Sequence, residues 1–160
     1  MTVIEDSVDA LKNTFRHHAS GVAIITLIDE AGKPVGFTAT SVTSLGATPP
    51  LASFNVASGS STWPALCKAT WVAIHTLGEK NQPLATKMAN DHTKRFANDD
   101  WTFGPKGLPI FPEATSVLIA GIREIHAVEN NAVVIVDVVD GLSGIEQRPL
   151  LYFQRNYLVG

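Results

Sequence analysis

The chain has 160 residues, which suits one domain with a well-formed hydrophobic core, so we expect residues 1–160 to fold as a single unit. Apolar residues make up 45% and charged residues 17%, and a net charge of −3 without a basic stripe argues against a nucleic-acid partner. The acidic start and the lack of any run of ~20 apolar residues argue against a signal peptide and a membrane span, so we expect a cytoplasmic protein.

One helix pattern and several strand patterns occupy the first third of the chain. Apolar residues at spacings of three and four predict an amphipathic helix over Ser7–Ala19. The apolar face of this helix carries Val8, Leu11 and Phe15. Short β-branched runs, separated by turn residues, then predict strands at Val22–Leu27, from Val35 onward, and at Leu51–Val56.

The remainder of the chain predicts short helices and further strands. Pro64 fits the first turn of a short helix over Trp63–Lys68, and Asn81–Ala97 is expected to hold one or two more. Strands are expected at Trp71–Leu77, Ser116–His126, Ala132–Leu142, Leu150–Phe153 and Tyr157–Val159. The connection Asn98–Glu113 is long, and such loops tend to cover a site or a partner. About seven strands with mostly short turns predict a mainly β fold, an antiparallel barrel with short peripheral helices.

A hydroxyl-rich stretch, Gly36–Leu45, is the most unusual part of the sequence. Treated as one strand, it has no cleanly apolar face, because side chains alternate and both alternating sets contain Thr or Ser. Such a strand offers backbone groups and hydroxyls to a flat polar ligand. An edge strand of a Thr-rich sandwich has the same composition, so both interpretations stay open at this point.

A second polar cluster, Ser58–Thr62, precedes the predicted short helix at Trp63. Hydroxyls and free N–H groups before a helix favour an anion such as a phosphate, whereas plain helix capping by Ser61 or Thr62 is the alternative. The cluster follows directly after the hydroxyl-rich strands. Together the two clusters predict a ligand with a flat polar ring at one end and a phosphate at the other.

Candidate catalytic and metal-binding groups are few. Cys67 is the only cysteine and has no paired histidine, so a buried structural thiol in a reducing compartment is expected. The five histidines show no metal-ligand spacing, so we predict no metal site. His75 lies within a strand pattern and is expected to be a hydrogen-bonded core or interface side chain. Neither a Rossmann glycine motif nor a P-loop motif is present.

Short motifs along nearly the whole chain occur in a characteristic order. They are Phe15-Arg16, Ser20–Thr26, Gly36–Leu45 with Pro49–Leu51, Ser60–Trp63, Val72–Leu77, Lys94–Phe96, Gly107–Pro109, Pro149–Phe153 and Tyr157. In order and spacing, these motifs resemble the short-chain flavin reductase family. Members of this family have the FMN-binding split-barrel fold and are the reductase components of two-component flavin-dependent monooxygenases.

The resemblance implies an antiparallel split β-barrel, a homodimer, and a flavin, FMN or FAD, near the subunit interface. It also implies NAD(P)H as co-substrate and a flavin-dependent monooxygenase as a possible partner. The flavin-binding residues that it implies are Thr38, Ala39, Thr40, Ser41, Thr43 and Ser44 at the ring and ribityl chain, Asn55, Val56, Ala57, Ser58, Ser60, Ser61 and Thr62 along the same wall, and Arg95 and Phe96, with Lys87, at the phosphate. Because the cofactor carries the chemistry, no catalytic side chain is predicted.

One position departs from the family pattern. Many relatives carry Gly-Asp-His before the penultimate long strand, with the histidine near the nicotinamide, where this chain has Glu129-Asn130-Asn131. Asn131 is a possible nicotinamide contact that donates hydrogen bonds but cannot carry a proton. A flavin-binding split barrel without reductase activity, an electron carrier or flavin store, therefore stays open, with a haem-binding split barrel as a third alternative. The sequence also leaves open FMN or FAD, NADH or NADPH, the partner oxygenase, and whether Asn98–Glu113 crosses the dimer interface.

Overall fold

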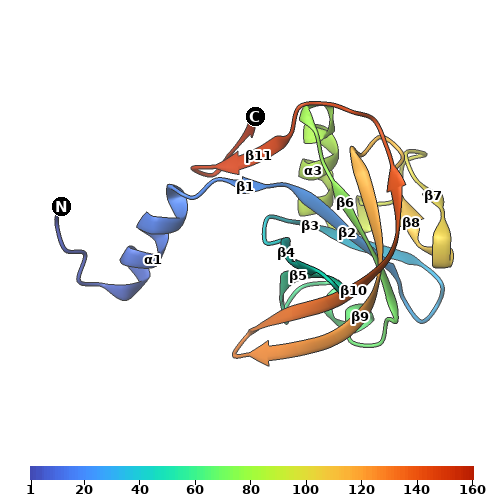
Figure 1. The fold of residues 1–160 in the computed structure, drawn as a ribbon, viewed down its shortest axis with the longest axis horizontal. Helices are drawn as coiled ribbons and strands as arrows, with labels where there is room; N and C mark the ends of the chain where they lie inside the picture. Colours follow the sequence, from blue (N-terminus) through green and yellow to red (C-terminus); the bar gives the residue numbers. More distant parts are fainter.

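A seven-stranded antiparallel sheet forms the body of the protein in a computed structural model that describes all 160 residues (Figure 1). Its strands, in spatial order, are β3 (Pro34–Ala39), β2 (Ala23–Ile28), β6 (Trp71–Thr76), β9 (Ser116–Val128), β10 (Asn131–Ser143), β5 (Pro50–Ala57) and β4 (Thr43–Ala47). Two small sheets contain β1 (Ser20–Gly21), β11 (Leu150–Phe153) and β12 (Asn156–Val159), and β7 (Thr102–Phe103) and β8 (Pro109–Ile110).

Short helices surround this sheet. They are α1 (Ser7–Arg16), α2 (Trp63–Leu66) and α3 (Gln82–Ala89), with 3₁₀ turns η1 (Glu79–Asn81), η2 (His92–Lys94) and η3 (Pro105–Gly107). The predicted mainly β, antiparallel architecture with short peripheral helices is confirmed. None of the helices combines the length and the apolar character that a membrane crossing requires.

Strands β2 and β6 are buried on both faces, and each face belongs to a different hydrophobic cluster. In β2, Ile25 and Leu27 join Phe54 of β5 in the cluster enclosed by the sheet. Ile24 points the opposite way and packs with Phe111 in a second cluster, under α3 and the Asn98–Glu113 connection. Each fully buried aliphatic side chain contributes about 1.5–3 kcal/mol. Burial of both faces explains why these strands are continuous apolar runs in the sequence.

The hydroxyl-rich stretch is not one strand, contrary to expectation. β3 ends at Ala39, Thr40–Val42 form a link, and β4 begins at Thr43 at the opposite edge of the sheet. Laid flat, seven strands ~4.8 Å apart would separate the two edges by about 29 Å, whereas a link of this length spans at most about 14 Å. The sheet therefore curls until its edges approach each other, and no ladder pairs β3 with β4. This geometry is an open, or split, barrel.

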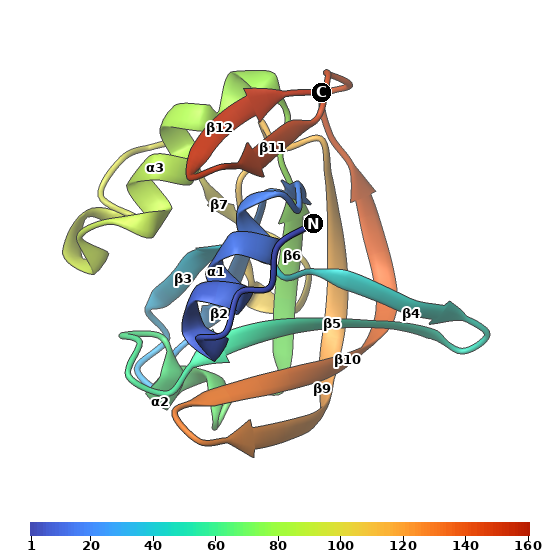
Figure 2. The ribbon, with the colours of Figure 1, turned by 90° about the vertical axis from the view of Figure 1, so that its left-hand side faces the viewer.

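Helix α1 stands away from the barrel in Figure 1, and Figure 2 shows the molecule from the side of this helix, with α1 in front. It begins after Asp6, whose Oδ1 accepts a hydrogen bond from the Asp9 N–H at 2.9 Å, and it ends at Arg16 rather than at Ala19. None of its residues is buried. Its apolar face is therefore unpartnered within the chain, with exposed fractions of 54% for Val8, 60% for Leu11 and 60% for Phe15.

Two other expectations need correction. Cys67 is exposed rather than buried. Helix α2 has a single turn, its buried position is taken by Leu66, and the next residue is rotated by about 100° toward solvent. The connection Asn98–Glu113 is not an irregular loop, because it contains the β7–β8 hairpin and η3.

Candidate functional site

A cleft of about 480 Å³ lies beside the link between the two sheet edges. Its lining residues are Phe15, His18, Ala19, Ser20, Gly21, Thr40, Ser41, Val42, Thr43 and Asn55. The Ser41 hydroxyl accepts a hydrogen bond from the Asn55 backbone N–H at 2.9 Å, which holds the link against β5. Three of the residues predicted at the flavin ring and ribityl chain, Thr40, Ser41 and Thr43, therefore meet in one cavity with Asn55, which was predicted on the same wall.

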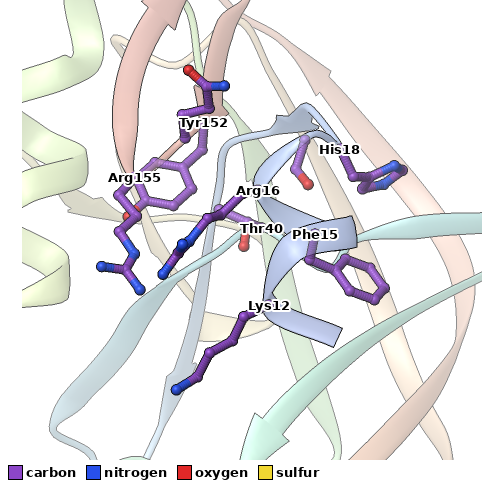
Figure 3. Close-up of a pocket in the computed structure, with 9 residues that line it drawn as sticks. Lys12, Phe15, Arg16, His18, Thr40, Tyr152 and Arg155 are labelled. Carbon is purple, nitrogen blue, oxygen red and sulfur yellow. The ribbon is translucent and has the colours of Figure 1, made fainter. Parts of the chain in front are cut away.

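A second pocket of about 260 Å³ adjoins this cleft (Figure 3). We call it the basic cup, and it is lined by Lys12, Phe15, Arg16, His18, Ser20, Thr40, Tyr152, Gln154 and Arg155. Helix α1 and the β11–β12 hairpin form most of its wall. Four lining residues, Phe15, His18, Ser20 and Thr40, belong to both cavities, so the cup and the cleft are neighbours.

A recess of about 50 Å³ lies at the other end of β3. Its lining residues are Pro34, Val35, Gly36, Ser61, Thr62, His92, Arg95 and Phe96. The Arg95 guanidinium organises it, because Nη1 donates to the Gly36 carbonyl at 2.8 Å, and Nε and Nη2 donate to the Asn90 carbonyl at 3.1 and 2.8 Å. Partial burial lowers the pKa of Arg95, since a charged guanidinium is less well solvated there. The predicted residues Ser61, Thr62 and Phe96 thus line the same recess as the Arg95 guanidinium, which was itself predicted at the phosphate.

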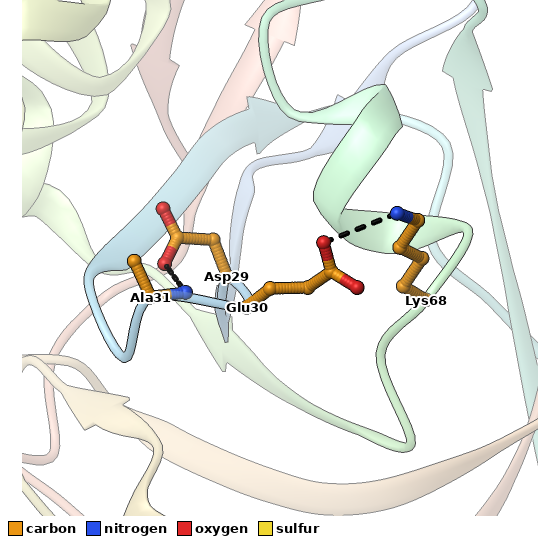
Figure 4. A network of polar contacts seen from close by, with 4 residues as sticks. All are labelled: Asp29, Glu30, Ala31 and Lys68. Atoms are coloured by element: carbon orange, nitrogen blue, oxygen red, sulfur yellow. Dashed lines mark hydrogen bonds and ion pairs between the residues drawn. The ribbon is translucent and has the colours of Figure 1, made fainter.

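The turn between β2 and β3 is held close to α2, which positions the recess (Figure 4). Asp29 Oδ1 accepts hydrogen bonds from the N–H groups of Ala31 and Lys33, each at 2.9 Å. Glu30 forms an ion pair with Lys68 at 3.1 Å. Because this ion pair is exposed, it contributes at most about 1 kcal/mol to stability. The shape of the turn therefore depends mainly on the hydrogen bonds to Asp29. Together they keep the start of β3 near the loop before α2.

The loop before α2 contains an unsatisfied hydroxyl. Ser60 Oγ is buried and has no hydrogen-bond partner within the protein, although most buried side-chain polar atoms have one. Thr62, at the helix start, makes no side-chain capping bond, so the capping alternative is wrong for this residue. Because α2 has one turn and Pro64 lacks an N–H, the helix adds little to an anion site. The donors for an anion are therefore the loop hydroxyls and Arg95.

The free edge of β3 runs between the recess and the cleft. Gly36 at the recess and Thr40 at the cleft are four residues apart, about 13 Å in an extended strand. The Gly36 carbonyl that accepts from Arg95 points away from β2, and the backbone groups of Thr38 share this direction. A Cβ atom at Gly36 would lie 2.5 Å from the Ile25 carbonyl oxygen, so glycine is required. The edge suits a long polar molecule with an anionic group at one end.

Comparison with known proteins identifies the family. The profile described as a flavin reductase like domain matches residues 15–159. The chain belongs to the flavin reductase family. The resemblance seen in the order of the sequence motifs is confirmed by this match.

Individual members of the flavin reductase family are similar over most of the chain. An NADH:FMN oxidoreductase from Rhodococcus erythropolis is 37% identical over 147 residues, 89% of this chain and 76% of that protein. HsaB, the reductase subunit of a flavin-dependent monooxygenase from Rhodococcus jostii, is 32% identical over 139 residues, 86% of this chain and 70% of that protein. The crystal structure of a flavin reductase domain protein from Arthrobacter sp. FB24 has a TM-score of 0.91 and 45% identity, covering 96% of this chain and 95% of that one.

Relatives of this flavin reductase domain differ in length. The chain spans 45% of the length of a Rhizobium meliloti protein named "Probable flavin reductase", to which it is 33% identical over 140 residues. The Arthrobacter protein, in contrast, matches it nearly end to end.

Three residues predicted to line the flavin site use their side chains for the fold. Thr38 donates its hydroxyl hydrogen to the Ala85 carbonyl of α3 at 2.6 Å. Ala39 and Val56 are each only 5% exposed and pack in the core enclosed by the sheet. A flavin along this edge could therefore contact Ala39 and Val56 through their backbone only.

Other predicted residues lie outside the cleft and the recess. These are Ser44, Ala57, Ser58, Lys87 and Ser60, whose hydroxyl oxygen is buried. Lys87 forms an ion pair with Asp100, so its charge is already partnered. Asn131 is exposed at the start of β10 and pairs with Ala57, and the Ser58 N–H donates to the Asn130 carbonyl at 3.0 Å. The β9–β10 turn therefore lies beside the loop that leads to Ser60.

His75 attaches the Asn98–Glu113 connection to the barrel. It is fully buried, as expected for a core histidine, with Nδ1 3.1 Å from the Ile24 carbonyl and Nε2 3.1 Å from the Phe111 backbone nitrogen. A carbonyl only accepts and an N–H only donates, so the ring is neutral with its hydrogen on Nδ1. Burial lowers the pKa of His75 to about 4, although the bond to Ile24 opposes the shift.

Sequence reasoning missed one wall of each cavity. Phe15, His18 and Ser20–Gly21 line the cleft, and Pro34–Gly36 and His92 line the recess. A signal for the cleft was available, because Phe15-Arg16 and Ser20-Gly21 are among the family motifs. The helical periodicity placed Phe15 on the apolar face of a helix but did not indicate what that face contacts. No local pattern distinguished His92 from a solvent-exposed loop histidine.

Proposed function

We propose that the protein is an NAD(P)H-dependent flavin reductase that supplies reduced flavin to a partner monooxygenase. The observation that carries this proposal is the edge of β3, where a cleft with hydroxyl groups and a recess with a cation lie about 13 Å apart. Family membership supports it, and so does its similarity to the R. erythropolis NADH:FMN oxidoreductase and to the R. jostii monooxygenase reductase subunit. A cytoplasmic location belongs to the proposal, because NAD(P)H is an intracellular donor.

The residues present fit a flavin, FMN or FAD, with its phosphate at the recess and its ring at the cleft. Arg95 and the hydroxyl of Ser61 would hold the phosphate, and the unsatisfied buried hydroxyl of Ser60 lies next to Ser61 in the chain. Thr40, Ser41 and Asn55 would line the ring. When bound, the flavin supplies the redox chemistry by accepting a hydride from the nicotinamide of NAD(P)H.

The contribution that we assign to the protein is position. The cleft contains no carboxylate and no lysine, His18 is its one ionisable lining residue, and its hydroxyl and amide groups can orient a polar ring by hydrogen bonds. Orientation alone accelerates a two-substrate reaction strongly, because both reactants are held in reacting geometry. Asn131 is proposed as a nicotinamide contact that donates a hydrogen bond from the β9–β10 turn.

A homodimer is also part of the proposal. The exposed apolar face of α1, with Val8, Leu11 and Phe15, has no partner within the chain, and Val133 of β10 adds a further exposed aliphatic side chain. Contact with a second copy would remove this surface from water. Sedimentation of the wild type and of Leu11→Asp tests this: we expect a dimer that the substitution weakens, and an unchanged monomer in both would contradict it.

The alternative is a flavin-binding relative without reductase activity, which the asparagine at position 131 favours. A haem-binding barrel is less well supported. His92 is the loop histidine that would serve as axial ligand to the iron, and the recess beside it has a volume of only about 50 Å³. Oxidation of NADH and NADPH, followed by absorbance with and without added FMN, separates the first two functions. FMN-dependent oxidation above the protein-free rate supports the reductase, whereas bound flavin without oxidation supports the alternative.

The flavin phosphate position is tested by Ser61→Asp. Ser61 is exposed and lines the recess, so an aspartate there would fold and pair with Arg95, competing with a phosphate. We expect FMN binding to weaken by about 1–3 kcal/mol. Riboflavin, which lacks the phosphate, is the matched control and should bind both forms equally. Equal FMN affinity would show that the phosphate lies elsewhere.

A further inference from the structure

A groove of about 340 Å³ adjoins the recess on the side away from the cleft, and we call it the outer groove. Asp29–Ala31 of the β2–β3 turn form one wall of it, and residues of α2 with Lys68 form the other. Val35 and Ser61 line both the outer groove and the recess. A group that continues from a phosphate at Arg95, away from the flavin ring, would therefore meet the outer groove.

FMN and FAD differ at this point of the site. FMN ends at its phosphate, whereas FAD continues through a second phosphate to an adenosine. The volume of the outer groove is within the range of ligand pockets, so lack of space alone does not exclude the AMP half of FAD. The charges of the groove therefore matter for the choice between the two flavins.

The outer groove carries two carboxylates and one cation. Glu30 and Lys68 form the ion pair that joins the turn to the end of α2 (Figure 4), so the one cation is already partnered. Asp29 takes part in no ion pair, and its negative charge is uncompensated. Lys106 lines a neighbouring cavity, with its Nζ 4.5 Å from the centre of the Trp71 ring, and does not line the outer groove. The groove is thus unfavourable for a second phosphate.

The two flavins distribute a similar charge differently. A phosphate monoester such as that of FMN carries a charge of about −1.5 to −2 near neutral pH, and all of it would lie beside Arg95. In FAD each phosphate carries a single negative charge, so one would stay at the recess and the other would lie near Asp29 and Glu30. FAD is therefore disfavoured on two counts, because it loses attraction to Arg95 and gains repulsion from the turn.

We propose that the protein selects FMN over FAD, and that Asp29 and Glu30 are the residues that discriminate against the second phosphate. The ion pair strengthens the selection, because this phosphate would have to displace Glu30 in order to pair with Lys68. The proposal rests on the proposed function, which places the flavin phosphate at Arg95.

Calorimetry with FMN, FAD and riboflavin tests the selection on the whole chain. The variants are Glu30→Gln and the double substitution Asp29→Asn with Glu30→Gln. Asparagine keeps a side-chain oxygen, so it can accept the two backbone hydrogen bonds that hold the turn. Glu146→Gln is the matched loss of one negative charge, because Glu146 is exposed and lines none of the described cavities.

The readout is the ratio of the FAD to the FMN dissociation constant. We expect a ratio of roughly ten for the wild type at low salt, and a fall of about threefold for each carboxylate removed, which is the Coulomb repulsion of unit charges about 7 Å apart in water. Added salt should lower the wild-type ratio, because the groove is exposed and its charges are screened. Glu146→Gln should leave the ratio unchanged, and riboflavin, which lacks a phosphate, should bind all four proteins equally.

Equal or tighter binding of FAD by the wild type would overturn the proposal. So would a ratio that stays the same in the double variant and at high salt, because shape rather than charge would then discriminate. The proposed function fails separately: selective FMN binding without NADH oxidation would leave the selection standing and the reductase function wrong. Efficient NADH oxidation with equal affinities for FMN and FAD would leave the reductase function standing and the selection wrong.

Discussion

Acidification should destabilise this protein through His75 more than through any exposed histidine. In the folded protein the neutral ring accepts a hydrogen bond at Nε2 from the Phe111 N–H. A proton added at Nε2 would face that N–H and break the bond, and the new charge would be buried among apolar side chains. The unfolded chain has no such constraint, so its His75 takes up a proton near the ordinary pKa of 6.5.

The size of the effect follows from the two pKa values. Between 6.5 and about 4 the unfolded state binds one more proton than the folded state, so the free energy of unfolding falls as the pH falls through this window. The contribution of neutral His75 is fully present above pH 6.5 and is lost by about pH 4. At about 1.4 kcal/mol per pH unit, the total loss is about 3 kcal/mol, and about 2 kcal/mol is already lost at pH 5.

Urea unfolding followed by tryptophan fluorescence measures this loss in the wild type and in His75→Gln. At pH 7.5 the variant should be less stable by about 1–3 kcal/mol, because it leaves buried hydrogen-bonding groups unsatisfied. At pH 5 the difference between the two proteins should shrink by about 2 kcal/mol, since only the wild type loses the His75 contribution. Carboxylates that titrate in both proteins cancel in this comparison.

His126→Gln is the control, because His126 is exposed on β9 and pairs only with the exposed Glu124. Its stability difference from the wild type should change by less than about 1 kcal/mol between the two pH values. If the His75→Gln difference is the same at pH 7.5 and pH 5, the buried histidine does not titrate in the described window and the reasoning is wrong.

Three further predictions concern the β3 edge and the β9–β10 turn. Gly36→Ala should destabilise the protein by about 1–3 kcal/mol in urea unfolding, because the new Cβ atom would meet the Ile25 carbonyl at 2.5 Å; unchanged stability would contradict this crowding. Thr38→Val should lower the free energy of unfolding by about 1 kcal/mol, because the hydrogen bond to the Ala85 carbonyl is lost, and should leave FMN affinity unchanged. Weaker FMN binding would show that the Thr38 hydroxyl contacts the flavin after all. Asn131→His should raise kcat/KM for NADH by roughly tenfold if an imidazole assists there, whereas an unchanged value would show that the asparagine is no handicap.

The strands were predictable because their signals are local. Val22–Leu27 and Val133–Val136 are nearly continuous apolar runs, and β2 and β10 are indeed interior strands of the sheet. Short turns between neighbouring runs indicated antiparallel pairing, which the registers confirm. His75 was predictable for the same reason, because a lone histidine within an apolar strand must be buried and hydrogen-bonded.

The break at Thr40–Val42 was not predictable from local pattern. A strand that continues and a strand that crosses to the other sheet edge can have the same Thr- and Ser-rich composition, since neither edge is fully buried. The decision depends on how far the whole sheet curls, which is set by strands distant in sequence. The partner of α1 was not predictable for a similar reason. The spacing of Val8, Leu11 and Phe15 reveals an apolar face of the helix but not what covers that face.

The failure of the barrel to close explains why the candidate site lies where it does. A closed barrel would use the outward backbone groups of β3 in hydrogen bonds to β4, and no ligand could reach them. In this protein Arg95 donates a hydrogen bond to the Gly36 carbonyl, the Thr38 hydroxyl donates one to the Ala85 carbonyl of α3, and Thr40 lies beside an open cleft. The polar groups of β3 are thus bonded to other protein groups at the recess and are open to a ligand at the cleft. A ligand that binds along it would complete the polar contacts that the missing strand pairing leaves unmade.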